Sequence, residues 1–207
     1  DWQDISHRQP FHLPSGRDVE VGVIYDIKYP IVGKENEIDN EFVMVSTTRP
    51  ETIFGDCAVA INSNDLRHMK YLHKTVHNPL TSQPLPIIID DELVKIDDGV
   101  FANAVKITPC HDFDDFDFGQ RHHLNGPRVI SERGMMTSNC GLYAGMDRFE
   151  ARKRVVEELQ RKGLLITERE HPMRIPVCSR SGDILEPSLL SQWFLKTDDL
   201  SAKVLSH

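Results

Sequence analysis

The sequence predicts an α+β fold, a β-rich domain with a partly closed β-barrel core and peripheral helices. Short β-branched apolar runs recur along much of the chain, whereas only a few segments have the spacing of an amphipathic helix. The length of 207 residues fits one large domain with a core of its own, and no internal repeat divides it.

Most of the expected elements are strands. Alternating apolar residues predict a strand over residues 19–29, which Pro30 and Gly33 should end. Apolar runs predict further extended segments at residues 41–46, 57–61, 84–89, 92–96, 104–107, 129–130, 172–177 and 192–195.

Four helices are expected between and after these strands. Asp65 can cap a short helix that reaches about residue 71. Acidic residues, which are favoured at a helix N-terminus, predict a helix over residues 112–122. The clearest apolar stripe predicts a helix over residues 146–162, which Gly163 should end, and a short helix is expected over residues 198–205.

Composition and charge exclude several classes of function. The net charge of −8 argues against a general nucleic-acid binder, although a local patch or the rest of a longer chain can still hold nucleic acid. The longest apolar runs cover only a few residues, so we expect no membrane helix. The chain starts at Asp1, without Met or a signal-peptide pattern, which suggests a fragment or a processed product.

The cysteines and histidines do not indicate a metal centre. The 4 cysteines are not paired at metal-ligand spacing, and the 10 histidines form no His-Glu-x-x-His motif. We therefore expect neither a metal nor a cofactor.

A first polar block, Thr-Thr-Arg-Pro-Glu-Thr at residues 47–52, follows an apolar run and is closed by Gly55 and Asp56. It places hydroxyl groups and a guanidinium at a strand end, and Arg49 can bind a phosphate or a carboxylate in a fork. The alternative is a surface ion pair between Arg49 and Glu51 beside a polar turn.

A second polar block covers residues 106–115. Lys106 and Thr108 lie two residues apart on a strand, so their side chains point to one face. Asp112 and Asp115 lie about one helical turn apart and also share a face. These four side chains can converge on one small volume. Spacing alone favours the alternative, which is a capped helix with solvated acids and a surface lysine.

Together, Thr-Thr-Arg-Pro-Glu-Thr, Gly-Asp and Lys-Ile-Thr-Pro-x-His-Asp-x-x-Asp resemble the editing domain of valyl-tRNA synthetases, the connective polypeptide inserted in class I synthetases. The resemblance covers nearly the whole chain. Residues 179–187, followed by Gln-Trp-Phe at 192–194, are similar to the stretch that returns to the catalytic core. That stretch favours the valyl enzymes, as does Lys106, because isoleucyl enzymes typically carry His there.

The resemblance implies an editing domain over residues 1–190, with the pocket-bearing core at about 40–165, and a return towards the catalytic core over residues 191–207. It implies hydrolysis of mischarged threonyl-tRNA(Val) by a positioned water. The parent enzyme would ligate valine to tRNA(Val) using ATP, in the cytoplasm or the mitochondrion. Because the class I signatures His-Ile-Gly-His and Lys-Met-Ser-Lys-Ser are absent, this segment should not itself bind ATP.

The resemblance also implies roles for individual residues. Asp115 matches the position that holds the substrate α-ammonium, and Lys106, Thr108 and Asp112 match positions that read the threonine side chain. Arg49, Thr48 and Thr52 match the opposite wall, near the terminal adenosine and the water. The candidate catalytic residues are Asp115, Thr52 and Arg49. The candidate substrate-binding residues are Thr47, Thr48, Lys106, Thr108, Asp112 and His111. The implied partners are the 3′ acceptor end of tRNA(Val), its threonine moiety and the parent catalytic core.

The sequence departs from the family at residues 100–103, Val-Phe-Ala-Asn, where Gly-Thr-Gly is usual before the Val-Lys strand. This departure motivates a first alternative, a module that binds the tRNA acceptor end and has lost hydrolysis. A second alternative is an isoleucyl-type editor that removes valine, against which Lys106 and Asp112 argue.

Overall fold

The computed structural model describes residues 1–33, 38–96 and 104–205, so the departure at residues 100–103 lies outside the described residues. Its strands are β1 (Trp2–Ile5), β2 (Gln9–His12), β3 (Asp18–Val21), β4 (Val23–Val32), β5 (Ile38–Thr47), β6 (Ala58–Ile61), β7 (Thr75–His77), β8 (Pro84–Ile89), β9 (Ala104–Ile107), β10 (Leu165–Glu170) and β11 (Met173–Pro176). Its helices are α1 (Leu66–Met69), α2 (Phe113–His122), α3 (Arg148–Arg161) and α4 (Asp198–Leu205), with 3-10 segments η2 (Pro50–Gly55) and η3 (Ser138–Tyr143).

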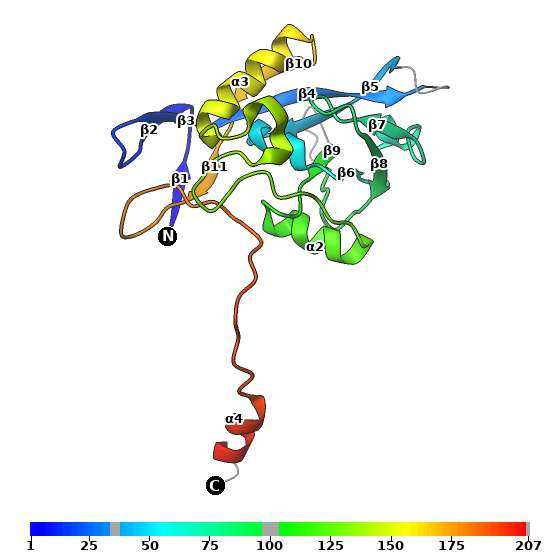
Figure 1. The fold of residues 1–207 in the computed structure, drawn as a ribbon. Coiled ribbons are helices and arrows are strands. Elements are labelled where there is room, and N and C mark those ends of the chain that lie inside the picture. Colours follow the sequence, from blue (N-terminus) through cyan, green and yellow to red (C-terminus); the bar gives the residue numbers. More distant parts are fainter. Residues whose placement is uncertain (34–37, 97–103, 206–207) are drawn as a thin grey trace.

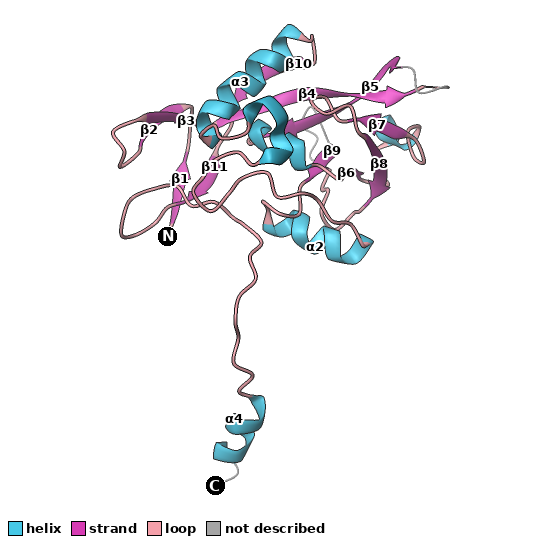
Figure 2. Ribbon diagram, in the orientation of Figure 1, coloured by secondary structure: helices cyan, strands magenta, loops and turns pink. Residues whose placement is uncertain are grey.

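The principal sheet curls into a nearly closed barrel (Figures 1 and 2). Strand β4 pairs with β5 along one edge and with β10 and β7 along the other, and the order continues through β8 and β6 to β9. Strands β5 and β9, at the two ends of this order, lie against each other. The predicted α+β fold with a partly closed barrel is therefore confirmed.

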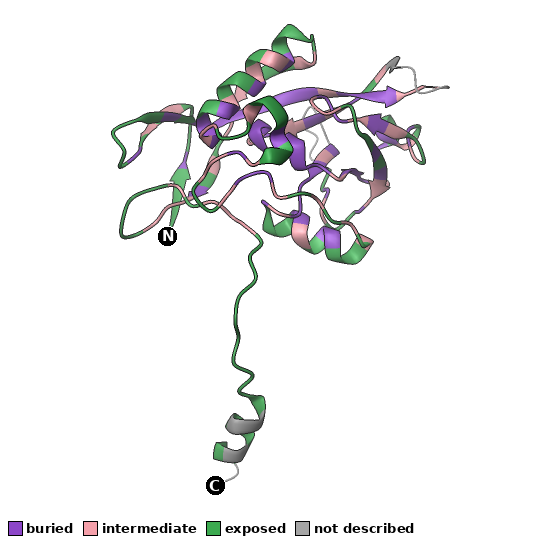
Figure 3. Ribbon diagram, viewed as in Figure 1, coloured by how far each residue is buried: buried purple, intermediate pink, exposed green. Residues whose placement is uncertain are grey.

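The barrel encloses the main hydrophobic core, which Figure 3 shows as the buried part of the ribbon. Ile27 and Tyr29 of β4 and Val59 of β6 are fully buried in it, and Leu159 of α3 covers it from outside the sheet. A smaller second core lies where β1 pairs with β11 and β2 with β3, and Phe149 of α3 packs into it. Helix α3 thus joins the two cores.

The expected helices all form, and local capping explains their bounds. The Asp65 carboxylate accepts a hydrogen bond from the amide of Arg67 at the start of α1. The carboxylate of Asp112 caps α2 in the same way, and that of Asp147 caps α3. Gly163, with φ of 68°, follows α3 in the left-handed region that glycine adopts without a steric penalty. Among the described residues, no helix is long and apolar enough to cross a bilayer.

Several expectations about strands are wrong. Strand β4 runs through Pro30 to Val32, because a register shift at this point lets β5 pair without the missing amide. Residues 92–96 form no strand, since the chain turns at residues 91–93, where the amide of Val94 donates to the carbonyl of Asp90. Residues 192–195 pair with no strand in the part of the chain that the structure describes, and Trp193 is fully exposed there.

Residues 129–130 contribute only an isolated bridge, between Ile130 and Met136, where a short strand was expected. The sequence did not predict β1, β2, β7 or β10. These strands are short or largely exposed, so their apolar patterns are weak.

Candidate active site

The closure of the barrel brings the two polar blocks together. Strand β5 ends at Thr47 and β9 ends at Ile107, and η2 and α2 follow from these two adjacent strand ends. A pocket of about 270 Å³ lies between them. Its lining includes all nine residues that the sequence analysis named: Thr47, Thr48, Arg49, Thr52, Lys106, Thr108, His111, Asp112 and Asp115.

A buried polar cluster lies along the Lys106 side of this pocket. The Lys106 ammonium donates to Thr108 Oγ1 at 2.5 Å and to Asp56 Oδ1 at 3.3 Å. Asp56 also accepts hydrogen bonds from the hydroxyls of Thr108 and Tyr29, each at 2.7 Å. Lys106 is only 7% exposed, so it is not the surface lysine of the alternative interpretation. The sequence analysis placed Asp56 at the end of the first block without giving it a role in the site, whereas it anchors this cluster.

The two aspartates of the second block have different environments. Asp112 is exposed, and its Oδ1 caps α2 by accepting from the amides of Asp114 and Asp115. Asp115 is buried, and its carboxylate accepts from the amide of Thr108 at 2.7 Å. Burial raises the pKa of Asp115 to about 7, and the Asp112 charge adds to this, although the Lys106 charge opposes it. The capped helix with solvated acids therefore describes Asp112 but not Asp115.

The raised pKa of Asp115 gives a testable pH dependence of stability. Between its ordinary pKa of 3.8 and about 7, the folded chain holds a proton on Asp115 that the unfolded chain has lost. The contribution of Asp115 to the free energy of unfolding is therefore fully present at low pH and is lost as pH rises through about 7. We therefore expect the free energy of unfolding of Asp115→Asn, minus that of the wild type, to increase when the pH is raised from 4.5 to 7.5. Urea unfolding at the two pH values measures this difference. A constant difference between the two proteins at both pH values would contradict this expectation.

Threonine hydroxyls line the opposite wall. The Thr47 hydroxyl oxygen accepts from the amide of Arg49 at 3.0 Å, which leaves its proton available to donate. The Thr52 hydroxyl donates to the carbonyl of Arg49 at 3.0 Å, which leaves its lone pairs available to accept. The wall thus combines a hydroxyl that can donate with one that can accept.

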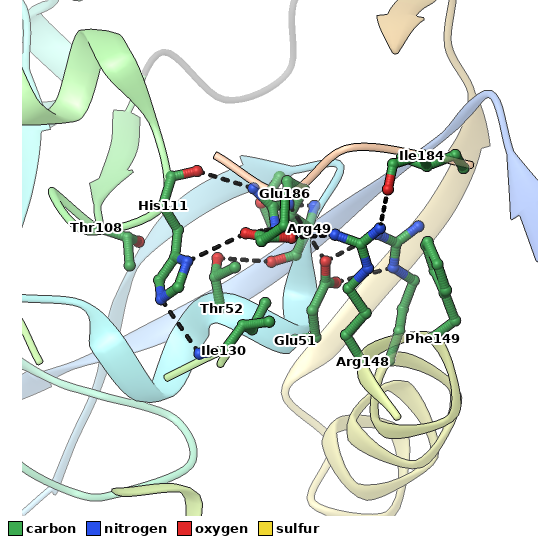
Figure 4. A network of polar contacts seen from close by, with 12 residues as sticks. Arg49, Glu51, Thr52, Thr108, His111, Ile130, Arg148, Phe149, Ile184 and Glu186 are labelled. Carbon is green, nitrogen blue, oxygen red and sulfur yellow. Dashed lines mark hydrogen bonds and ion pairs between the residues drawn. The ribbon is translucent and has the colours of Figure 1, made fainter. Parts of the chain in front are cut away.

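Arg49 makes different contacts from those that the sequence suggested. Its guanidinium donates to both carboxylate oxygens of Glu186 at 2.7 Å, to the carbonyl of His111 at 2.8 Å and to Glu51 at 3.3 Å (Figure 4). Glu51 also receives two hydrogen bonds of 2.8 Å from Arg152, and these charges bring the pKa of the buried Glu51 carboxyl to about 2. The ion pair with Glu51 exists, but it is buried and secondary to the pair with Glu186.

His111 is also engaged within the protein. Its Nε2 accepts from the amide of Val129 at 2.9 Å, so its proton lies on Nδ1, which is 3.1 Å from Glu186. Sequence reasoning missed Glu186 as a site residue. The only available signal was its place in the run at residues 179–187, because nothing in its local pattern indicates that it folds back against residues 49 and 111.

No family model matches the sequence. Among curated proteins, the chain is 40% identical over 202 residues to the mitochondrial valine–tRNA ligase of Saccharomyces cerevisiae, covering 96% of this chain and 18% of that protein. It is 42% identical to the valine–tRNA ligase of Schizosaccharomyces pombe over 96% of this chain and 20% of that protein. It is 41% identical to that of Staphylococcus aureus strain RF122 over 92% of this chain and 22% of that protein.

Over nearly its whole length, the chain is homologous to a segment of the valine–tRNA ligases. It spans about a fifth of the length of the relatives that it matches. Among solved structures it is similar to GlLeuRS-CP1, with a TM-score of 0.53 and 14% identity, covering 72% of this chain and 100% of that one. At this identity the likeness concerns the fold, which is that of a CP1 domain.

Proposed function

We propose that this chain is the editing domain of a valine–tRNA ligase and hydrolyses the ester of threonyl-tRNA(Val) with a positioned water. The observation that carries the proposal is the convergence of both polar blocks on one pocket with the buried Lys106 and Thr108 at its side. In this proposal residues 1–190 form the editing domain and residues 191–207 lead back to the catalytic core.

The proposal extends to the full-length protein. It would ligate valine to tRNA(Val) using ATP, and the pocket would receive the 3′ acceptor end of that tRNA with its threonine moiety. We place it in the cytoplasm or the mitochondrion, since the similar proteins include a mitochondrial enzyme and bacterial ones.

Threonine is nearly isosteric with valine, so a hydrophobic pocket for valine rejects it weakly. Valyl-tRNA synthetases are the established example of this limit, with discrimination of about a hundredfold. A second pocket that recognises the extra hydroxyl overcomes the limit, because valine leaves the polar groups of such a pocket unpaired.

Lys106 is suited to reading that hydroxyl. An ammonium group has three donors, and within the described residues Lys106 uses two of them, on Thr108 and Asp56. The third can donate to the threonine hydroxyl, whereas valine would place a methyl group against it. Because Asp56 and Thr108 hold the lysine in place, little side-chain entropy is lost on binding.

Asp115 is suited to holding the α-ammonium group. Its ionised carboxylate can pair with the cation, which in turn favours the ionised form and lowers the pKa that burial has raised. The other aspartate, Asp112, lies at the pocket rim as the cap of α2.

Hydrolysis would need no covalent intermediate. The Thr52 hydroxyl oxygen can accept a hydrogen bond from the attacking water, whose oxygen bonds to the ester carbonyl carbon while the bond to the ribose oxygen breaks and a water proton passes to that oxygen. The products are threonine and a tRNA whose ribose hydroxyl has gained the proton. Because most of the donors of Arg49 are engaged by Glu186, His111 and Glu51, we assign Arg49 to the support of this wall.

The test is deacylation of threonyl-tRNA(Val) and valyl-tRNA(Val), side by side, by the full-length protein. We expect threonyl-tRNA(Val) to be hydrolysed about 10⁴-fold faster, as for sites built to hydrogen-bond a substrate hydroxyl. Binding of the acceptor end without hydrolysis above the spontaneous rate would indicate the module with lost hydrolysis. Faster hydrolysis of valyl-tRNA(Ile) than of threonyl-tRNA(Val) would indicate the isoleucyl-type editor.

A further inference from the structure

We propose that Glu186 is a positioning residue for the hydrolysis, and that it acts by holding the two walls of the pocket together. Glu186 belongs to residues 183–187, which we call the strap. The effect on hydrolysis rests on the proposed function, whereas the effect on the two walls does not.

The carboxylate of Glu186 contacts both walls directly. From the first wall it accepts two hydrogen bonds of 2.7 Å from Arg49, and from the second wall it accepts one of 3.1 Å from His111. Arg49 also donates to the carbonyl of His111 at 2.8 Å, which closes a triangle among the three residues (Figure 4). Glu186 therefore lies behind the pocket, where the two walls meet.

Hydrogen bonds also hold the strap against α3 and β11. Arg148, at the start of α3, donates to Glu186 Oε2 and to the carbonyl of Ile184, each at 2.5 Å. The amide of Leu185 donates to the carbonyl of Pro176 at 2.8 Å, at the end of β11. The Glu186 side chain is 11% exposed, so water screens these contacts little. The strap continues into the extended segment that carries α4 (Figure 1). The contacts that hold the strap in place therefore also link that segment to the pocket.

The charge balance explains why the walls depend on this carboxylate. The cluster holds the guanidinium groups of Arg49, Arg148 and Arg152, against the carboxylates of Glu186 and Glu51. Removing the Glu186 charge leaves these cations with Glu51 alone in a largely buried site. Arg49 and Arg148 then repel each other, and a glutamine at this position has a single acceptor oxygen for Arg49, Arg148 and His111. The walls shift although every residue proposed to contact the substrate is still present.

The first test is Glu186→Gln in the full-length protein. We expect kcat for threonyl-tRNA(Val) deacylation to fall about a hundredfold, the effect of a displacement of about 1 Å at a reacting site. The KM for this substrate should change little, because the groups proposed to bind it remain, and ligation of valine should continue at the wild-type rate.

The matched control is Asp65→Asn. Asp65 is also a buried carboxylate that pairs with both an arginine and a histidine, Arg67 at 2.8 Å and His68 at 3.1 Å, but it lies at α1 outside the pocket. We expect this variant to lose thermal stability without slower deacylation. An equal loss of kcat in both variants would reduce the role of Glu186 to general stability and overturn the proposal.

The second test is amide hydrogen exchange in the same two variants. Glu186→Gln should speed exchange at the Thr52 amide, bonded to the Arg49 carbonyl, and at the His111 amide, bonded to the Thr108 carbonyl, and Asp65→Asn should not. If amide exchange in both walls is unchanged in Glu186→Gln, the proposal is overturned whatever the rate of deacylation. If exchange is faster but kcat is unchanged, the role of Glu186 in hydrolysis is overturned. If the wild type does not hydrolyse threonyl-tRNA(Val), the proposed function fails, and exchange alone decides whether Glu186 joins the walls.

Discussion

Replacing Asp115 with Asn is expected to lower kcat/KM for threonyl-tRNA(Val) deacylation about a thousandfold in the full-length protein. The α-ammonium of the substrate would enter a buried site without its carboxylate partner, and leaving a buried charge unpaired costs about 4 kcal/mol. Each 1.4 kcal/mol is a factor of about ten, which gives the expected loss. Asn keeps an oxygen that can accept from the Thr108 amide, so the pocket itself should persist.

The control for this variant is Asp117→Asn, an exposed aspartate on the same helix that does not line the pocket. It should deacylate like the wild type. Near wild-type kcat/KM in Asp115→Asn would show that another group holds the ammonium, and would remove the main residue of the proposed mechanism.

The wild-type rate should also depend on pH through Asp115. Only the ionised carboxylate can pair with the ammonium, so kcat/KM should rise as pH rises through about 7, the pKa of this group. In Asp115→Asn the same rise should be absent. At saturating threonyl-tRNA(Val) the bound cation lowers the pKa of Asp115. The increase in kcat should therefore occur at a lower pH than the increase in kcat/KM. If kcat/KM of Asp115→Asn rose with pH as in the wild type, the pH dependence would belong to a group other than Asp115.

Replacing Lys106 with Met is expected to weaken the preference for threonine. The variant loses a charged hydrogen bond to the threonine hydroxyl, worth about 2 kcal/mol, so the ratio of threonyl to valyl deacylation rates should fall about thirtyfold. The ratio is measured within one protein preparation, so a smaller folded fraction affects both rates equally. The ratio is used because Lys106→Met leaves Asp56 buried without its cation, which should destabilise the fold.

Two further variants separate recognition from stability. Lys106→Met combined with Asp56→Asn removes the unpaired carboxylate and should recover stability while the ratio stays low. Lys95→Met, an exposed lysine bonded to the Asp91 carbonyl, should keep the wild-type ratio. An unaltered ratio in Lys106→Met would place recognition of the hydroxyl elsewhere in the pocket.

The elements that build the site follow from local sequence. The strand ends at Thr47 and Ile107 and the cap of Asp112 on α2 depend on contacts within a few residues. The apolar pattern and capping chemistry encode such contacts directly. Most of the expectations that failed were apolar runs with no place in the sheet. Residues 192–195 have the composition of a strand but no partner to pair with, and composition cannot reveal that.

By itself the sequence determined the two polar blocks, the strand ends that carry them and, through their joint resemblance, the family. Tertiary structure alone decided which groups are buried and paired. Strands β5 and β9 meet only because the whole sheet curls, and this places the blocks opposite each other. The contact of Arg49 with Glu186 joins residues 137 positions apart, so it depends on how distant elements pack and leaves no local pattern. Asp115 becomes a weak acid for the same reason, since desolvation is a property of the folded pocket and not of the residues beside it in the chain.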